Sequence, residues 1–470
     1  METGASVTQA THQQDGAVGK MARWIVALAA GDIPAPIRAI AQNCLIDTIG
    51  VIAAGSATAV AAHARALVSL SAAAGPCGIV GTDASCDPRH AAFANGVAAH
   101  ALDFDDNCYA GFVHGSAVIA PAALAAAQYA DADGAQLITA FVAGAECEYA
   151  LGAATANVLY DQGWWTTGVL GPVGACAATA KLLGLDVKQT AAALGLAAAG
   201  AAGIKACFGT DAKAFLAGRA AEAGMTAALM AQGGASGPAD AFEHRNGFAR
   251  LFNGGRFDGQ AFDTLGCDWR LQSPGVDVKR IPVCLSSHAA VDAAMALVQE
   301  HAIRLYDIVA ITCNVPPIVI ANLVHDDPGT AQQAQFSMPF AIAASLLYGT
   351  LRLEHLSAQT LADERLRRLM ERVSMVHGAV WDDPAYRAAA PEGAEVSIAL
   401  ADGRMLQGFR DFARGAARYP LDAGELDAKF KDCLGFAGLS GDAASAPARH
   451  WLARLRALET FGSVRGLLAA

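Results

Sequence analysis

The chain is poor in charged and aromatic residues. Of its 470 residues, 16% are charged and 7% are aromatic, whereas 54% are hydrophobic. An average soluble protein has about 25% charged residues, so the low fraction favours a large buried interior or a large subunit interface. The apolar content excludes disorder for most of the chain. A formal net charge of −11 without a basic run argues against nucleic acid or an anionic membrane as a partner.

The motifs of nucleotide enzymes and metalloenzymes are also missing. The chain has no GxGxxG after a strand, no Walker loop, no HExxH and no GxSxG. Its 11 cysteines are odd in number and form no CxxC pair, which fits neither a disulfide framework nor a zinc site. We expect most of them to be small buried side chains. The sequence therefore predicts a reduced, cytoplasmic protein of enzyme size.

No segment has the pattern of a membrane span or a signal peptide. The longest uncharged stretches, 162–180 and 328–351, are interrupted by glycine and proline. Residues 1–20 are polar and rich in glycine and alanine, and we predict a flexible leader there. The apolar stretch 24–30 is too short for the core of a signal peptide. We therefore expect no membrane partner.

Helical periodicity dominates residues 33–255, where apolar side chains recur at i, i+3 and i+4. Pro36 fits the first turn of a helix that runs through Ile46 toward Val51. The sequence LGLD at 183–186 predicts a helix end and then an N-cap for a helix over 187–199.

The pattern changes after about residue 257. Residues 307–315 alternate and are β-branched, which predicts a strand, and 395–409 predicts a hairpin around Asp402-Gly403. Further helices are predicted at 335–348, 361–373, 421–434 and 448–458. The expected fold is mainly α: a large helical domain, then a smaller α+β insert, after which the C-terminal helices return to the first domain.

The densest polar cluster lies inside an otherwise apolar stretch. It comprises His100, Asp103, Asp105, Asp106, Asn107 and His114. One interpretation is a general base or acid, His114, with Asp103 as the carboxylate that orients it. The alternative is a solvated turn between two helices, with Asp106 or Asn107 as an N-cap.

Two groups of cations stand in uncharged surroundings. Lys205 and Lys213 flank a short segment after a helix of small residues, and Lys279 and Arg280 lie close to Cys284. Such lysines can bind a substrate carboxylate. The alternative for Lys205 and Lys213 is a surface cation that complements the negative C-terminal end of a helix dipole.

Several segments in the same order resemble the MmgE/PrpD family. They are CLIDTIGVIAAG, AFANGVAAHALDFDDN, HGSAVIAPAALAAA, GWWTTGVLGPVGACAATAKLLGLD, GTDAKAFLAGRAAEAGMTAAL, KRIPVCLSSHAAVDAAMAL, AQFSMPFAIAASLLYG and RYPLDAGELDAKF. The resemblance covers essentially the whole chain after the leader. The family includes 2-methylcitrate dehydratase, cis-aconitate decarboxylase and iminodisuccinate epimerase.

The resemblance implies a large all-helical domain built from both chain ends, a smaller α+β lid, a homodimer, and no metal or organic cofactor. The corresponding boundaries are a leader at 1–20, the first part of the helical domain at 21–265, the lid at 266–410 and returning helices at 411–470.

Matching positions carry over one residue at a time. Asp103 matches the first carboxylate of the DFDD motif, His114 the histidine that follows it, Lys213 the lysine of GT-x-x-K, and Lys279 the lysine of K-x-x-P. In the family, these positions line a pocket between the helical domain and the lid.

The chain departs from the family pattern at five positions. Trp165 and Leu216 replace histidines, Asn107 stands where threonine is common, Phe340 where tyrosine is common, and Cys284 where some members have histidine. We predict that Asn107, Trp165, Cys284 and Phe340 contact the substrate, together with Lys279 and Arg280. Tyr160 is the candidate that would replace the missing proton donor.

The predicted reaction is proton transfer at a carbon next to a carboxylate. His114 is the predicted base, and Lys213 and Lys279 stabilise the developing enediolate. The leading hypothesis is a lyase that acts on a small di- or tricarboxylic acid. The alternatives are an epimerase or racemase of an iminodisuccinate-type acid, and a catalytically silent paralogue that binds a carboxylate.

Overall fold

The computed structural model describes residues 16–156, 158–439 and 450–469. The chain forms two compact units. The helical unit comprises Met1–Ala101, Asp105–Val276 and Leu426–Ala470, and the α+β unit comprises Leu102–Phe104 and Asp277–Glu425. After residue 104, the chain passes from the helical unit to the α+β unit between residues 276 and 277, and returns to the helical unit between residues 425 and 426. The sequence analysis predicted these two boundaries at 265/266 and 410/411.

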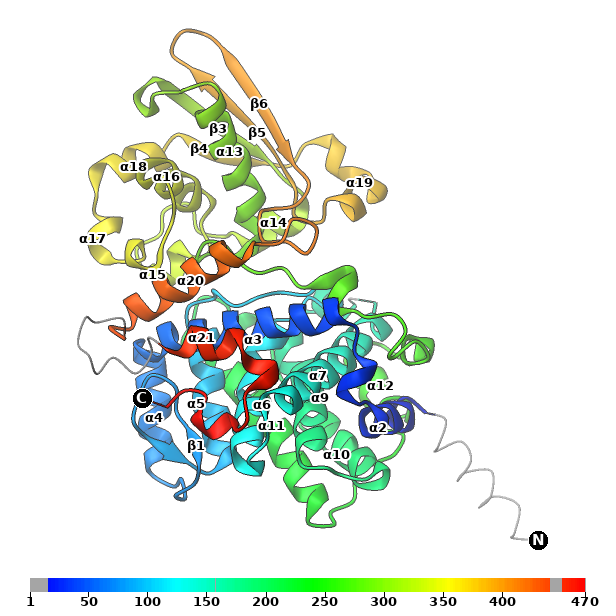
Figure 1. Cartoon of the computed structure of the whole chain (residues 1–470). Helices are drawn as coiled ribbons and strands as arrows, with labels where there is room; N and C mark the ends of the chain where they lie inside the picture. Colours follow the sequence, from blue (N-terminus) through cyan, green and yellow to red (C-terminus); the bar gives the residue numbers. More distant parts are fainter. Residues whose placement is uncertain (1–15, 157, 440–449, 470) are drawn as a thin grey trace. The chain divides into compact units, whose positions relative to one another are not determined.

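The helical unit contains nearly all of the long helices, with one small β-ribbon. Its elements are α2 (Ala17–Ala27), α3 (Ala35–Ser56), α4 (Ala59–Ser69), β1 (Cys77–Gly78), β2 (Ser85–Cys86), α5 (Pro88–His100), α6 (Gly115–Ala130), α7 (Gly134–Ala154), α8 (Val158–Asp161), α9 (Thr166–Leu182), α10 (Val187–Ala199), α11 (Asp211–Gln232), α12 (Phe248–Phe252) and α21 (Trp451–Arg456). The C-terminal α21 packs on α3, and Figure 1 shows it in red beside the blue helix.

Small residues let the central helices approach closely. Helix α11 packs on α5 and α9, and α7 packs on α9. A Cβ atom built on Gly96 would lie 2.9 Å from the Cα atom of Gly218, so α5 and α11 touch backbone to backbone. Helices α3 and α7 are long and apolar enough to cross a membrane by length and composition, and 72% and 94% of their most apolar stretches are buried inside the protein.

The α+β unit contains a four-stranded sheet of order β4-β3-β5-β6. Its elements are α13 (His288–Glu300), β3 (Ile308–Asn314), α14 (Pro317–Asn322), α15 (Ala331–Ala334), α16 (Met338–Tyr348), α17 (Ala358–Leu361), α18 (Glu364–Met370), β4 (Val373–Val376), α19 (Pro384–Ala389), β5 (Ala394–Leu400) and β6 (Met405–Arg410). Alternate residues of β5 are buried and pack with α13 and α16 in one apolar core. Helix α20 (Ala423–Phe436) begins in this unit and ends in the helical one.

Local patterns predicted several elements correctly. The strand, the hairpin and the helix α10 are confirmed: Gly403 in the hairpin turn has φ 88°, and Gly184 before α10 has φ 64°. Asp186 caps α10 by accepting a hydrogen bond from the backbone N–H of Gln189 at 2.8 Å. The mainly α fold class is also confirmed.

Two local predictions are wrong at their edges. Residues 17–20 are not part of a leader but belong to α2, where the side chain of Glu243 accepts a hydrogen bond from the N–H of Ala17 at 2.7 Å. Val373 is not helical, because it begins β4 and pairs with Ile311 of β3. Residues 1–15 of the predicted leader, and residues 448 and 449 of the last predicted helix, lie outside the described residues.

The cysteines are as expected. All eleven are free thiols, and nine of them are buried. Cys267 is exposed and Cys284 is half-buried.

Candidate active site

The polar cluster occupies the loop between α5 and α6. Helix α5 ends at His100, and His114 is the N-cap residue of α6. An antiparallel bridge between Cys108 and Val113 closes the loop. At the loop's end, the hydroxyl of Thr167 in α9 accepts a hydrogen bond from the backbone N–H of His114 at 3.0 Å. Three helices therefore fix the position of His114.

The loop is buried rather than solvated. The side chains of Asp105 and Asp106 are fully inaccessible, and Asn107 is 9% exposed. Neither Asp106 nor Asn107 is the N-cap of α6. The interpretation of this segment as a solvated turn is therefore wrong, because the surrounding helices cover the carboxylates.

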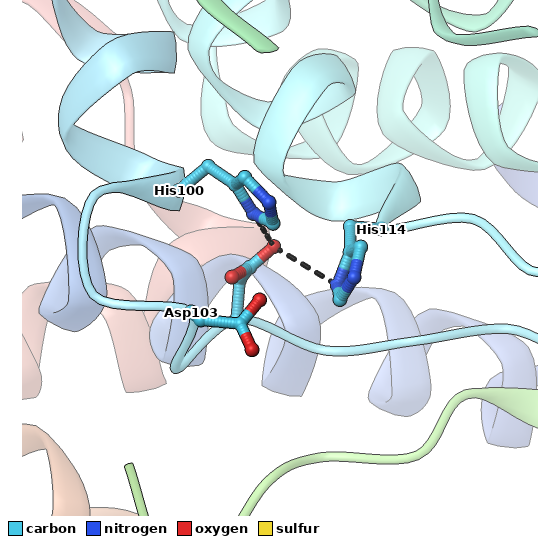
Figure 2. A group of neighbouring side chains, drawn as sticks. His100, Asp103 and His114 are labelled. Atoms are coloured by element: carbon cyan, nitrogen blue, oxygen red, sulfur yellow. Dashed lines mark hydrogen bonds and ion pairs between the residues drawn. The ribbon is translucent and has the colours of Figure 1, made fainter. Parts of the chain in front are cut away.

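One carboxylate oxygen joins the two histidines. Oδ2 of Asp105 lies 2.7 Å from Nδ1 of His100 and 3.3 Å from Nδ1 of His114. In Figure 2, dashed lines join the labelled rings of His100, at the end of α5, and His114, at the start of α6, to one oxygen of an unlabelled carboxylate, which these two distances identify as Asp105. The ring centroids of the two histidines are 4.6 Å apart. The sequence had named Asp103 as the orienting carboxylate, whereas Asp105 is the carboxylate that reaches Nδ1 of His114 through this contact.

Asp106 supports the same histidine from the backbone. Its carbonyl oxygen lies 2.8 Å from Nδ1 of His114. Its carboxylate accepts a hydrogen bond from the hydroxyl of Ser116. Burial raises the pKa of Asp106 to about 7, an effect that Ser116 opposes and the charge of Asp47 reinforces. Two successive aspartates therefore each place an acceptor oxygen near Nδ1 of His114.

The loop carries two strained backbone positions. Asp103 and Phe112 have φ values of 49° and 50°, in the left-handed region that non-glycine residues rarely adopt. The hydroxyl of Thr166 donates a hydrogen bond to the carbonyl oxygen of Phe112 at 2.5 Å and so stabilises the backbone at this position. Such positions cost about 1–3 kcal/mol each and concentrate at functional sites, which supports a functional role for this loop.

Lys213 lies in the first turn of α11 and is 7% exposed. Its charge contributes to the low pKa of His100, so the two side chains are electrostatic neighbours. The alternative of a surface cation at the C-terminal end of a helix is wrong for Lys213, because it lies at an N-terminus and is buried. Lys205 lies in a 3-10 turn, with its ammonium nitrogen 3.2 Å from the ring centroid of Tyr160.

Trp165 places an apolar ring beside His100. It is the N-cap residue of α9, is 2% exposed, and its ring centroid lies 5.3 Å from that of His100. Tyr160, in the short helix α8, is partly exposed and its ring lies 5.0 Å from that of Phe112. Its role as a proton donor stays a prediction.

The remaining predicted residues belong to the α+β unit. Lys279 is 1% exposed, and its ammonium group lies 3.1 Å from Oδ2 and 2.5 Å from the carbonyl oxygen of Asp103. Arg280 forms an ion pair with Asp292. Phe340 is fully buried in the core of this unit. The substrate-binding roles of these residues stay predictions.

Cys284 belongs to a small polar chain in the same unit. Its thiol donates to the hydroxyl of Ser286 at 3.6 Å, and that hydroxyl in turn donates to the carboxylate of Glu392. Burial raises the pKa of Cys284 to about 11, and the charge of Asp103 adds to this effect. The thiol therefore stays protonated near neutral pH.

Sequence reasoning assigned no role to two residues of the cluster, His100 and Asp105. Both lie within the polar segment, but nothing in the spacing showed which of three aspartates faces His114. Among the described residues, one group of side chains is close enough to hold a metal ion, and it includes His100, Asp105 and His114. Their contacts are those of a carboxylate that accepts two N–H groups, so we assign no metal to them.

Comparison with known proteins supports the family resemblance. The MmgE/PrpD N-terminal domain model matches residues 19–260, and the C-terminal domain model matches residues 281–444. A cis-aconitate decarboxylase-like protein of Aspergillus oryzae is 26% identical over 86% of this chain and 87% of its own length. The cis-aconitate decarboxylases of mouse and human are each 28% identical, over 73% and 74% of this chain and 71% and 73% of their own lengths. The two domain models together span most of the sequence, and the protein therefore belongs to the MmgE/PrpD family.

Proposed function

We propose that this protein is a lyase that removes carbon dioxide or water from a small di- or tricarboxylic acid without a metal or organic cofactor. Relatives that are named cis-aconitate decarboxylases support the reaction class. The observation that carries the proposal is the buried Asp105 carboxylate that fixes the ring of His114. cis-Aconitate is the first substrate to test.

In this proposal His114 transfers a proton to or from the carbon next to a substrate carboxylate. Such a carbon is a very weak acid, so the enediolate that develops needs a fixed positive charge. Lys213 supplies this charge, because it is buried and its charge acts on His100, the ring next to His114. In a buried site, this charge acts more strongly than it would in water.

Proton NMR in D2O tests the reaction directly, with cis-aconitate and a panel of citrate-, succinate- and aspartate-derived acids. Loss of carbon dioxide or water, with deuterium entering next to a carboxylate, establishes the lyase. Deuterium exchange with inversion and without elimination establishes the epimerase instead. No turnover of any acid by folded protein contradicts the proposal and favours a silent carboxylate-binding paralogue. The homodimer and the cytoplasmic location stay predictions.

Point variants test the two roles. We expect His114→Gln to lower kcat by about 10²–10⁴-fold, the usual contribution of a general acid or base. Lys213→Met is expected to raise KM and lower kcat together. Lys188→Met is the matched control, because Lys188 is exposed on α10 of the same unit. Near-normal turnover of the His114 variant would remove this residue from the mechanism.

A further inference from the structure

The shared carboxylate of Asp105 raises the question of where the protons of the two imidazoles lie. The side chains of Asp105 and His100 are both fully inaccessible, and that of His114 is 13% exposed. Figure 2 shows the two contacts as dashed lines that converge on one oxygen. His114 is therefore the member of the three that keeps access to solvent.

His100 is the inner, neutral member. Burial lowers the pKa of His100 to about 4, even though the charge of Asp105 opposes this change. Burial also acts to raise the pKa of Asp105, but the two histidines outweigh it and hold this pKa well below its usual range. Asp105 is therefore ionised near neutral pH, and a neutral His100 can approach it at 2.7 Å only with a proton on Nδ1.

The geometry at His114 determines its tautomer in the same way. Two oxygens face its Nδ1: Oδ2 of Asp105 at 3.3 Å and the carbonyl oxygen of Asp106 at 2.8 Å. A backbone carbonyl and an ionised carboxylate can only accept hydrogen bonds. Nδ1 must therefore carry a proton, and in the neutral ring the lone pair is on Nε2.

We propose that Asp105 and His100 are positioning residues, which hold His114 as the Nδ1–H tautomer and so make Nε2 the atom that exchanges a proton with the substrate. His100 holds the Asp105 carboxylate in place through the shorter contact. The other charged or titratable groups around the pair are Lys213, which acts on His100, the carboxyl of Asp106, which is bonded to Ser116, and the carboxylate of Asp103, which has an oxygen within 4.8 Å of both histidines. The inference depends on the proposed function for its catalytic meaning, but the tautomer itself does not.

The effect on turnover should be large. In a serine protease triad, the change from aspartate to asparagine beside the catalytic histidine leaves the geometry intact but lowers kcat about 10⁴-fold, because the wrong tautomer forms. Here the carbonyl of Asp106 still accepts from Nδ1, so we expect a smaller loss for Asp105→Asn, about 10²–10³-fold in kcat. KM should change little, because Asp105 contacts Nδ1 of His114, whereas the proposed contact with the substrate is at Nε2.

The decisive measurement is a long-range proton–nitrogen NMR spectrum of protein labelled with ¹⁵N-histidine near neutral pH. His114→Gln assigns the signals of His114 by their disappearance. In the wild type, we expect His114 as the Nδ1–H tautomer. In Asp105→Asn, we expect a shift toward the Nε2–H tautomer, because the new amide can donate to Nδ1. Asp382→Asn is the matched control, since Asp382 contacts His377 at 2.9 Å on the surface of the other unit.

Each outcome decides the inference. A wild-type His114 in the Nε2–H tautomer overturns it even if the Asp105 variant fails to fold. An unchanged tautomer in a folded Asp105→Asn protein also overturns it. A tautomer change with the expected loss in kcat supports it. Failure of the proposed function has a different signature, because the wild type would then turn over no acid while its His114 tautomer would still be measurable.

Discussion

Glu148 is a buried carboxyl whose protonation should set the pH dependence of stability. It lies in the middle of α7 and is fully buried, and neither carboxyl oxygen has a hydrogen-bond partner in the described part of the chain. A Cβ atom built on Gly174 of α9 would lie 2.5 Å from Oε2 of Glu148, so the backbone of α9 packs against the carboxyl and leaves no room for a larger side chain at Gly174. An ionised form is therefore strongly disfavoured there.

The magnitude follows from the difference in pKa between the folded and unfolded chain. Burial, and next the charge of Asp106, raises the pKa of Glu148 from 4.5 to about 8. The folded state therefore holds a proton that the unfolded state releases, and stability falls as the pH rises from about 4.5 to about 8. At about 1.36 kcal/mol per pH unit, this carboxyl costs about 5 kcal/mol above pH 8 and nothing below pH 4.5.

Glu148→Gln removes this titration and keeps the shape of the side chain. We expect the variant to match the wild type near pH 4.5 and to be increasingly more stable toward pH 8. Urea denaturation, followed by circular dichroism at a series of pH values, measures the difference. Infrared spectroscopy adds a direct test, because the variant should lose one protonated-carboxyl band near neutral pH.

The control is Glu300→Gln, at an exposed position at the end of α13. It should leave the pH dependence unchanged. Parallel stability curves for Glu148→Gln and the wild type across this range would refute the reasoning, since they would mean that Glu148 titrates normally in the folded protein.

Two further predictions concern the helical unit. Lys429 and Asp47 form a buried ion pair at 2.7 Å, so Lys429→Met should lower the free energy of unfolding by about 3–5 kcal/mol, measured by urea denaturation. Adding Asp47→Leu to this variant should recover most of that loss, because no unpaired charge then stays buried. A double variant as unstable as Lys429→Met alone would contradict this account. A Cβ atom at Gly55 would lie 1.9 Å from the carbonyl oxygen of Ala98, so Gly55→Ala should lower the free energy of unfolding by about 1–3 kcal/mol, measured by thermal unfolding. Gly31→Ala is the control and should be nearly neutral in the same assay, because among the described residues a Cβ atom at Gly31 would have nothing within 4 Å beyond its own turn of the chain.

Elements with local causes were predictable from sequence. Asp186 caps α10 through its own neighbours, and Gly403 supplies the left-handed residue of the hairpin turn. The errors occurred where a distant residue decides the outcome. Val373 becomes a strand because Ile311 pairs with it, and α2 begins early because Glu243 accepts from its first N–H.

The candidate site shows the same division. The sequence by itself determined the family pattern, the helical class and the cluster of histidines and aspartates, because residue types and their order carry this information. Only the tertiary structure decided that Asp105 faces His114, that Lys213 is buried at a helix start, and that Asp103 pairs with Lys279. The reason is physical: which carboxylate meets which cation depends on strained loop dihedrals and on helices far apart in the chain, and neither follows from the local pattern of residues.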